Sequence, residues 1–317
     1  SYGNAGWLSS QSIIPPSFPG VWRQVPGSLR DPLGPEVHFG SEQFIDELAV
    51  ATGEDPVAFR LRYLTAARDI AVVKAIAEAC ASTGIIYATN FHAMKPVIDF
   101  GTEEQKERLL PRIAAGSLAA LAITEPGAGS DATAMTTRFR GDGKTILIEG
   151  NKTFITNGDV ADLILVFGKW AGIDDPKKAI SAVVFEKGTP GFEVLRLEDK
   201  MGHRASSTAA ISFNGSRVPR KNLIGEPGDG LKILLASLNK SRPSIAAHAL
   251  GIATAAFNDM TAYINERKAG GKRIAEFQGN QFMLADLASE LAMTENWLDY
   301  VCGLIDGGAS DFSLEAS

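Results

Sequence analysis

Apolar side chains recur three and four positions apart over much of the first third of the chain, which is the spacing of helices. This spacing predicts helices over residues 42–51, 55–80 and 81–92. Thr102 is followed three positions later by a glutamine, a capping box that starts another helix, which we expect to end at Gly116.

The pattern changes to that of strands over residues 119–216. Apolar runs at 163–167, 180–185 and 209–213 are separated by Gly, Pro and Asp turns, the spacing of a small barrel. Alternating apolar residues on either side of a Gly-Asp-Gly turn at 141–143 predict a hairpin.

Helical spacing returns near the C-terminal end. Residues 231–268 follow it, with an interruption expected at Pro243, and so do residues 276–305, after which Gly307 breaks the pattern. The proline-rich segment 1–40 shows no sustained period and is predicted to be irregular.

Composition excludes several classes of function. With 317 residues, 45% hydrophobic and 21% charged, the chain can fold into two or three soluble domains. Its net charge of −6 argues against nucleic-acid binding, and no apolar run approaches membrane-spanning length. Cys80 and Cys302 are too few for a disulfide framework, and the histidines form no cluster, so we expect no metal and a reduced, cytoplasmic protein.

The chain is organised around the stretch Ile123-Thr-Glu-Pro-Gly-Ala-Gly-Ser-Asp131. Glycines let backbone N–H groups approach a phosphate or a ring, and Thr124 and Ser130 add hydroxyls. A tight surface turn is the simpler alternative. The pattern Gly127-x-Gly129-x-x-Ala132 also resembles a dinucleotide fingerprint, but a hairpin follows it where that fingerprint needs a helix.

This stretch and the later Gly150-Asn-Lys-Thr-Phe-Ile-Thr-Asn-Gly158 together resemble the flavin-binding middle domain of the acyl-CoA dehydrogenases. The resemblance runs from residue 79 to residue 317 and implies an α+β fold. It implies the end of an N-terminal helical domain at 79–118, a flavin-binding middle β-barrel domain at 119–226 and a truncated C-terminal helical bundle at 227–317.

The first quarter of the chain is similar to a different family. Gly20-Val-Trp-Arg-Gln-Val-Pro-Gly-Ser28, Glu42-Gln-Phe-Ile-Asp-Glu-Leu-Ala49 and Gly53-Glu-Asp-Pro-Val-Ala-Phe-Arg-Leu-Arg62 resemble the molybdopterin-binding large subunit of the xanthine dehydrogenases and aldehyde oxidases. The match covers residues 10–78. We therefore expect a chimera in which residues 1–78 are a molybdenum-hydroxylase-like fragment.

The dehydrogenase resemblance implies FAD as the cofactor and oxidation of an acyl-CoA thioester to its enoyl form. Thr124 and Thr156 match hydroxyl donors to the flavin, and Phe154 stands where many members have tryptophan. The full set of implied flavin contacts is Leu121, Ala122, Ile123, Thr124, Glu125, Pro126, Gly127, Ala128, Gly129, Ser130, Phe154, Ile155, Thr156, Arg267 and Gln278.

Substrate contacts are implied at Ser130 and at the turn Asn239, Lys240, Ser241 and Arg242. Arg242 is the strongest candidate, with an ordinary solvated arginine as the alternative. The family's Arg-x-x-Phe-Gly motif has glycine for phenylalanine at position 270, which puts adenine packing in doubt. No catalytic residue is identified, since the family's glutamate is expected beyond Ser317 and its alternative position holds Ser241.

The resemblance thus predicts an FAD-dependent acyl-CoA dehydrogenase, inactive as given because the base is missing. A flavin oxidase or monooxygenase of the same fold, or a catalytically dead flavin-binding fragment, are the alternatives. An electron-transfer flavoprotein is the implied acceptor, and a homo-oligomer (dimer or tetramer) the implied assembly.

Overall fold

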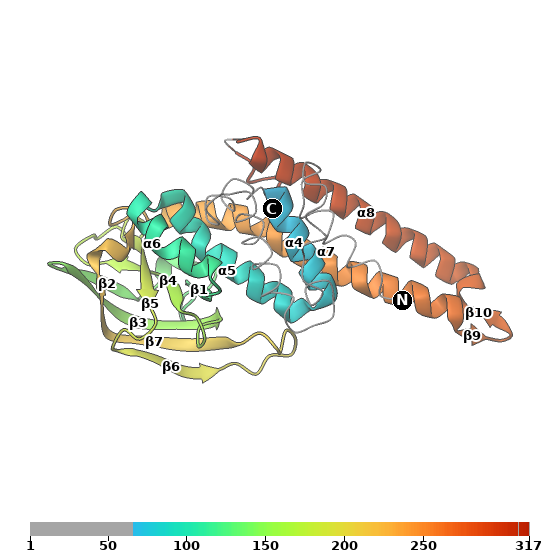
Figure 1. Cartoon of the computed structure of the whole chain (residues 1–317), viewed down its shortest axis with the longest axis horizontal. Helices are drawn as coiled ribbons and strands as arrows, with labels where there is room; N and C mark the ends of the chain where they lie inside the picture. Colours follow the sequence, from blue (N-terminus) through green and yellow to red (C-terminus); the bar gives the residue numbers. More distant parts are fainter. Residues whose placement is uncertain (1–65, 310, 317) are drawn as a thin grey trace, which may run out of the picture. The chain divides into compact units, whose positions relative to one another are not determined.

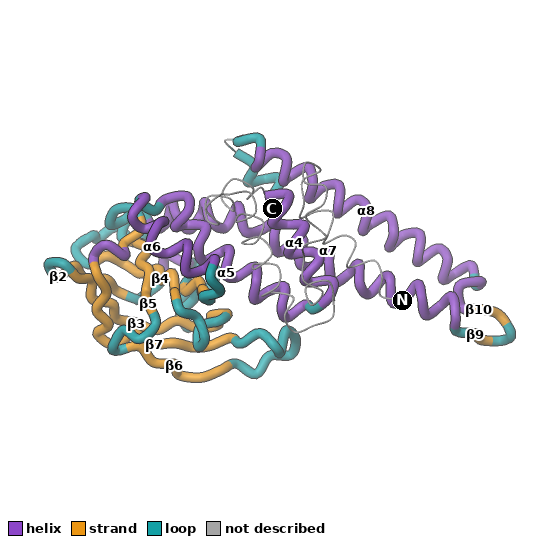
Figure 2. Tube along the Cα trace, in the orientation of Figure 1, coloured by secondary structure: helices purple, strands orange, loops and turns teal. Residues whose placement is uncertain are grey.

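The computed structural model describes residues 66–309 and 311–316. The helix expected at 42–51, the first part of that at 55–80 and the segment 1–40 lie outside the described residues. The described chain falls into two compact units, a helical unit of residues 66–85 and 239–316 and a β-rich unit of residues 86–238 (Figures 1 and 2).

The predicted helices are confirmed where the structure describes them. Thr102 caps its helix as expected, with its hydroxyl accepting the N–H of Gln105 at 3.3 Å while Gln105 Oε1 accepts the N–H of Thr102 at 2.8 Å. The α-helices are α4 Ala66–Ala79, α5 Ala81–Phe100, α6 Glu103–Ala114, α7 Gly230–Glu266 and α8 Gln278–Asp306, and the short 3₁₀ helices are η3 Ala132–Ala134, η4 Arg220–Asn222 and η5 Ile274–Glu276.

The interruption predicted at Pro243 is wrong, because α7 continues through it as one helix. A proline removes a single backbone hydrogen bond, here the one to the carbonyl of residue 239. Pro243 and the neighbouring Ser244 and Ala247 are buried, so packing within the helical unit holds the helix together across that missing bond.

The β-rich unit is built on one eight-stranded sheet with the order β6-β7-β3-β2-β4-β5-β8, and β1 adds to β4 in parallel. The end strands β6 and β8 do not pair in the described chain, so hydrogen bonds do not close the expected barrel into a ring. The strands are β1 Ala119–Ala122, β2 Arg138–Asp142, β3 Thr145–Thr156, β4 Leu163–Trp170, β5 Ile180–Glu186, β6 Phe192–Leu197, β7 Thr208–Pro219 and β8 Leu223–Ile224, with a separate hairpin of β9 Lys268–Ala269 and β10 Lys272–Arg273.

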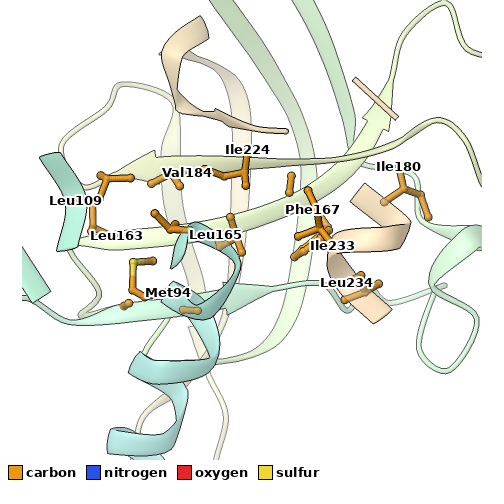
Figure 3. Close-up of a cluster of buried hydrophobic side chains, with 14 of the residues drawn as sticks. Met94, Leu109, Leu163, Leu165, Phe167, Ile180, Val184, Ile224, Ile233 and Leu234 are labelled. Carbon is orange, nitrogen blue, oxygen red and sulfur yellow. The ribbon is translucent and has the colours of Figure 1, made fainter. Parts of the chain in front are cut away.

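Both faces of the central strand β4 are buried, which explains its unbroken apolar run. Leu165 and Phe167 face the cluster shared with α5 and α6, whereas Ile164 and Val166 face the cluster shared with β3 and β7. Figure 3 shows Met94 of α5 beside the strand residues of the first cluster. The helices therefore cover one face of the sheet and leave its other face to the hairpins.

The helical unit packs α4 closely against α7 and α8. A Cβ at Gly251 of α7 would lie 2.3 Å from the carbonyl oxygen of Lys74, so only glycine permits this approach. Lys74 forms an ion pair with Glu295 of α8. His248 Nε2 lies 2.7 Å from the carbonyl oxygen of Ala81, where α5 begins. The expected boundary between residues 78 and 79 therefore falls in the last turn of a packed helix.

Candidate flavin site

The two predicted flavin motifs lie against each other in the β-rich unit. The backbone N–H of Thr153, in β3, donates to the carbonyl of Thr124 at 2.9 Å. The first motif follows β1 and turns back at once, since Glu125 and Ala128 exchange backbone hydrogen bonds of 3.0 and 3.1 Å around Pro126 and its following glycine. Proline and glycine are favoured at the centre of such a turn. The tight turn considered from sequence is therefore present, and it lies beside the second motif.

A buried ion pair lies beneath this contact. Lys152 Nζ is 2.9 Å from Glu125 Oε1 and donates to the carbonyl of Ile123 at 2.8 Å. The side chains are 0% and 3% exposed. Glu125 Oε2 also accepts the N–H and the hydroxyl of Thr136 at 2.6 and 2.7 Å, and its Oε1 accepts the N–H of Thr137 at 2.9 Å.

These contacts keep both groups charged near neutral pH. Burial would raise the pKa of Glu125, but the Lys152 ammonium and the hydrogen bonds outweigh it and lower that pKa to about 2. Burial lowers the pKa of Lys152 to about 8, with Glu125 opposing the shift. The Glu125 carboxylate therefore makes its hydrogen bonds inside the protein, and it faces away from any ligand on the outer surface of the loop.

The implied flavin contacts divide by where their side chains lie. Thr124 and Thr156 are half-buried, and their hydroxyls form no hydrogen bond to another described residue. Ala122, Ala128 and Ile155 are buried in the core and can meet a ligand only through their backbone. The remaining positions of the two motifs are the half-buried Leu121 and Ile123 and the exposed Pro126, Gly127, Gly129, Ser130 and Phe154.

The glycines of the first motif leave open space. A Cβ at Gly127 or Gly129 would meet no atom within 4 Å, so packing inside the protein does not require glycine there. Within the described chain, the N–H groups of Gly127, Gly129 and Ser130 donate no hydrogen bond. Free N–H donors next to free hydroxyls form a set that suits the polar edge of a flavin or its phosphates.

Phe154 is held in a left-handed backbone conformation, with φ 58°, and is 62% exposed. The pairing of β3 with β7 shifts register between Lys152 and Ile155, so this residue lies in an irregular stretch of the strand. Left-handed φ is rare for an aromatic residue and costs about 1–3 kcal/mol. Strain that directs an apolar ring toward solvent is a feature of binding sites rather than of cores.

The implied substrate turn belongs to the helical unit, whereas Ser130 belongs to the β-rich unit. On α7, Arg242 is exposed and its Nη1 donates to Asn239 Oδ1 at 3.0 Å, and Asn239 Nδ2 donates to Ser313 Oγ at 2.8 Å. Lys240 and Ser241 are half-buried on the same turn. The structure therefore gathers these four residues but does not relate them to the flavin motifs.

Arg267 and Gln278 are exposed residues of the helical unit on either side of the β9–β10 hairpin. The turn of that hairpin holds Gly270 and Gly271 at φ 58° and 82°. Two successive positive φ values define a type I′ turn, which favours glycine. The glycine that replaces the family's phenylalanine thus fits the backbone but provides no ring for packing.

Sequence reasoning missed Lys152 and the loop between β6 and β7. Lys152 lies within the region predicted to be β from sequence, and a lysine that is buried in a strand requires an internal partner. In the loop, the carbonyl of Ser207 accepts the N–H of Asn157 at 3.1 Å, and its hydroxyl donates to Asp159 at 2.6 Å. This loop therefore borders the second motif, and no short-range signal in the sequence indicates it.

The described residues contain no group of His, Cys, Asp and Glu side chains that could hold a metal ion. None of their helices combines the length and apolarity that a membrane crossing requires.

Family models of the acyl-CoA dehydrogenases match most of the chain. The N-terminal domain matches residues 61–117, the middle domain residues 120–216 and the C-terminal domain residues 228–317. The N-terminal match begins upstream of residue 79, where the resemblance read from sequence began, and it includes all of α4. These matches do not show the expected chimera, and the dehydrogenase match over residues 61–78 overlaps the end of the expected molybdenum-hydroxylase-like fragment.

Individual relatives agree with the family models. The chain is 37% identical to the acryloyl-CoA reductase (NADH) of Anaerotignum propionicum over 75% of its length and 61% of the reductase. It is 41% identical to a short-chain specific acyl-CoA dehydrogenase of Clostridium acetobutylicum over 69% of its length and 58% of that enzyme. The chain thus spans about 60% of these curated relatives.

Among solved structures, the butyryl-CoA dehydrogenase of Megasphaera elsdenii superposes with a TM-score of 0.82. It is 30% identical, and the match covers 98% of this chain and 82% of that one. The order of helices, sheet and helices, the paired motifs and these relatives lead to one conclusion: the chain belongs to the acyl-CoA dehydrogenase family.

Proposed function

We propose that this chain binds FAD through the two motifs of its β-rich unit and belongs to an enzyme that oxidises acyl-CoA thioesters to their α,β-enoyl forms. One observation carries the proposal. Within the described residues the hydroxyls of Thr124 and Thr156 have no hydrogen-bond partner, and they lie on the loop after β1 and at the end of β3, which the Thr153–Thr124 backbone bond holds together.

The described residues fit a flavin in three respects. Unbonded N–H groups at Gly127, Gly129 and Ser130 provide donors for phosphate or ring oxygens. The threonine hydroxyls provide donors at the ring's polar edge. The exposed ring of Phe154 provides an apolar surface that excludes water from one side. When bound, FAD supplies the acceptor for the hydride that leaves the β-carbon of the thioester.

Proton removal needs a base that the proposed substrate turn does not offer. Ser241 occupies the position where one branch of the family carries its glutamate, and an unassisted hydroxyl is not a base near neutral pH. We therefore propose that a polypeptide of these 317 residues binds flavin but dehydrogenates acyl-CoAs poorly.

We also propose, from the family resemblance, that an electron-transfer flavoprotein is the acceptor, that a homo-oligomer completes the flavin site and that the protein is cytoplasmic. A foreign origin of residues 10–78 is likewise a proposal. The dehydrogenase match over residues 61–78 counts against the last part of that foreign segment.

The test is a titration of the purified 317-residue chain with FAD, followed by flavin fluorescence and the visible spectrum. Saturable binding supports the proposal. If FAD gives the same spectrum with and without the protein, the proposal is wrong. Anaerobic addition of an acyl-CoA then measures bleaching. Rapid oxygen consumption with a substrate that is not a CoA thioester would instead support the oxidase alternative.

A further inference from the structure

We propose that the Glu125–Lys152 ion pair is a positioning device that sets the two flavin motifs in register. In this proposal the two side chains act through Thr124 and Thr156 and do not touch the flavin. The inference rests on the proposed function, because it states how that same site is held in shape.

Lys152 binds the first motif on both sides of Thr124. Its ammonium donates to the carbonyl of Ile123 at 2.8 Å and to Glu125 Oε1 at 2.9 Å. The residues before and after the threonine are therefore fixed by one cation. Since the lysine side chain is 0% exposed, bulk solvent does not compete for these contacts.

Glu125 extends the connection to the start of β2. Its carboxylate accepts two hydrogen bonds from Thr136 and one from the N–H of Thr137, at 2.6 to 2.9 Å. The tight turn of the first motif is thereby tied to the chain that follows it. With Lys152 included, the carboxylate has four donors and no capacity left for a ligand.

The second motif needs such a connection because its sheet pairing is broken. The β3–β7 ladder shifts register between Lys152 and Ile155, so ladder hydrogen bonds do not fix the stretch that holds Phe154. Lys152 begins this stretch, and Thr153 bonds to Thr124 in the other motif. The ion pair and this backbone bond replace the missing sheet contacts.

Stability alone does not account for a buried pair of charges. Removing two charges from water is so unfavourable that well-packed apolar residues of similar volume often stabilise a protein equally well or better. A pair with five directed bonds instead selects one relative arrangement of the two motifs. Compared with an uncharged pair of similar volume, the ion pair is therefore expected to affect flavin binding more than the free energy of unfolding.

The experiment compares Lys152→Met with Arg108→Met in the full 317-residue chain. Arg108 is the matched control, since its Nη1 contacts Glu186 Oε1 at 2.7 Å in the same unit and joins α6 to β5, and its partners Glu186 and Asn222 belong to neither motif. FAD dissociation constants, visible spectra and denaturant unfolding are measured for each. We expect both variants to be less stable, but only Lys152→Met to weaken FAD binding by about tenfold or more and to shift the flavin spectrum.

The double variant Glu125→Gln with Lys152→Met separates positioning from stability. Without a lone buried charge it should regain most of the stability, yet its FAD affinity should stay low because the carbonyl of Ile123 has lost its donor. If Lys152→Met does not fold, the double variant still tests whether loss of the ion pair weakens FAD binding.

Two outcomes would contradict the inference, and they differ. If the Lys152 variants bind FAD as tightly as Arg108→Met, with the same spectrum, the pair is only structural. If the unmodified chain binds no FAD, the proposed function itself fails and the positioning role fails with it.

Discussion

The backbone N–H of Thr153 lies 2.9 Å from the carbonyl oxygen of Thr124, and this bond joins two motifs that are well separated in the sequence. It places the loop after β1 against the irregular end of β3. Both hydroxyls that we assign to the flavin, at Thr124 and Thr156, belong to segments that this bond connects. The site is therefore a product of sheet topology as much as of either motif.

Substituting Thr156→Ala should weaken FAD binding. The substitution removes one hydroxyl donor and leaves its partner on the ring unsatisfied, a loss of about 1–3 kcal/mol. Flavin fluorescence titration measures the change. Thr145→Ala is the matched control at the other end of β3, where the hydroxyl donates only to the carbonyl of Asp142 at 3.1 Å. Equal affinities for both variants would remove Thr156 from the site.

Substituting Gly251→Ala should destabilise the helical unit. The new methyl group would lie 2.3 Å from the carbonyl oxygen of Lys74, and overpacking of this kind costs about 1–3 kcal/mol. Gly303→Ala is the control, since it is an α8 glycine whose Cβ would meet nothing within 4 Å. There the better helix propensity of alanine should add up to about 1 kcal/mol. Denaturant unfolding followed by circular dichroism compares them, and a stable Gly251→Ala would show that α4 and α7 can separate.

Stability should fall at acidic pH in a way that depends on Glu125. Its pKa is lowered to about 2 in the folded chain, from an ordinary value of 4.5. A lowered carboxyl pKa stabilises the folded state above the ordinary value, and that contribution is lost as pH falls from about 4.5 toward 2. The loss is about 3 kcal/mol at most.

The measurement is the free energy of unfolding of the unmodified chain and of Glu125→Gln between pH 2 and pH 6. The difference between the two should shrink steadily as the pH is lowered. Parallel curves over the whole range would mean that the Glu125 carboxyl titrates normally and that the ion pair is not formed in solution.

Substituting Ser241→Glu should raise the rate at which acyl-CoAs reduce bound flavin. A positioned general base contributes about 10²–10⁴-fold, so even an imperfect geometry should give a measurable increase in anaerobic stopped-flow bleaching. Ser241→Gln is the control, since it has the same shape without a basic carboxylate. Fast reduction by the unmodified chain would show instead that another residue already acts as the base.

The sequence predicted those features that depend on neighbouring residues. The capping box at Thr102 was identified correctly because its two partners lie three residues apart. The apolar runs of β4 and β5 were identified as strands because both of their faces are buried. The predicted interruption at Pro243 was wrong because packing around α7 compensates for a lost backbone hydrogen bond.

The residue types of the two motifs determined the family and the chemistry that the site can support. The tertiary structure alone decided which of these residues are accessible on the surface and which are buried. Glu125 and Ile155 turn inward whereas Thr124 and Phe154 do not. The reason is physical: Glu125 faces inward because Lys152, from a distant strand, compensates its charge, and Lys152 is the only buried lysine or arginine among the described residues. Phe154 faces outward because a register shift against β7 interrupts the alternation of β3. Contacts between segments that are distant in the sequence therefore determine the orientation of both side chains, and no local sequence pattern indicates it.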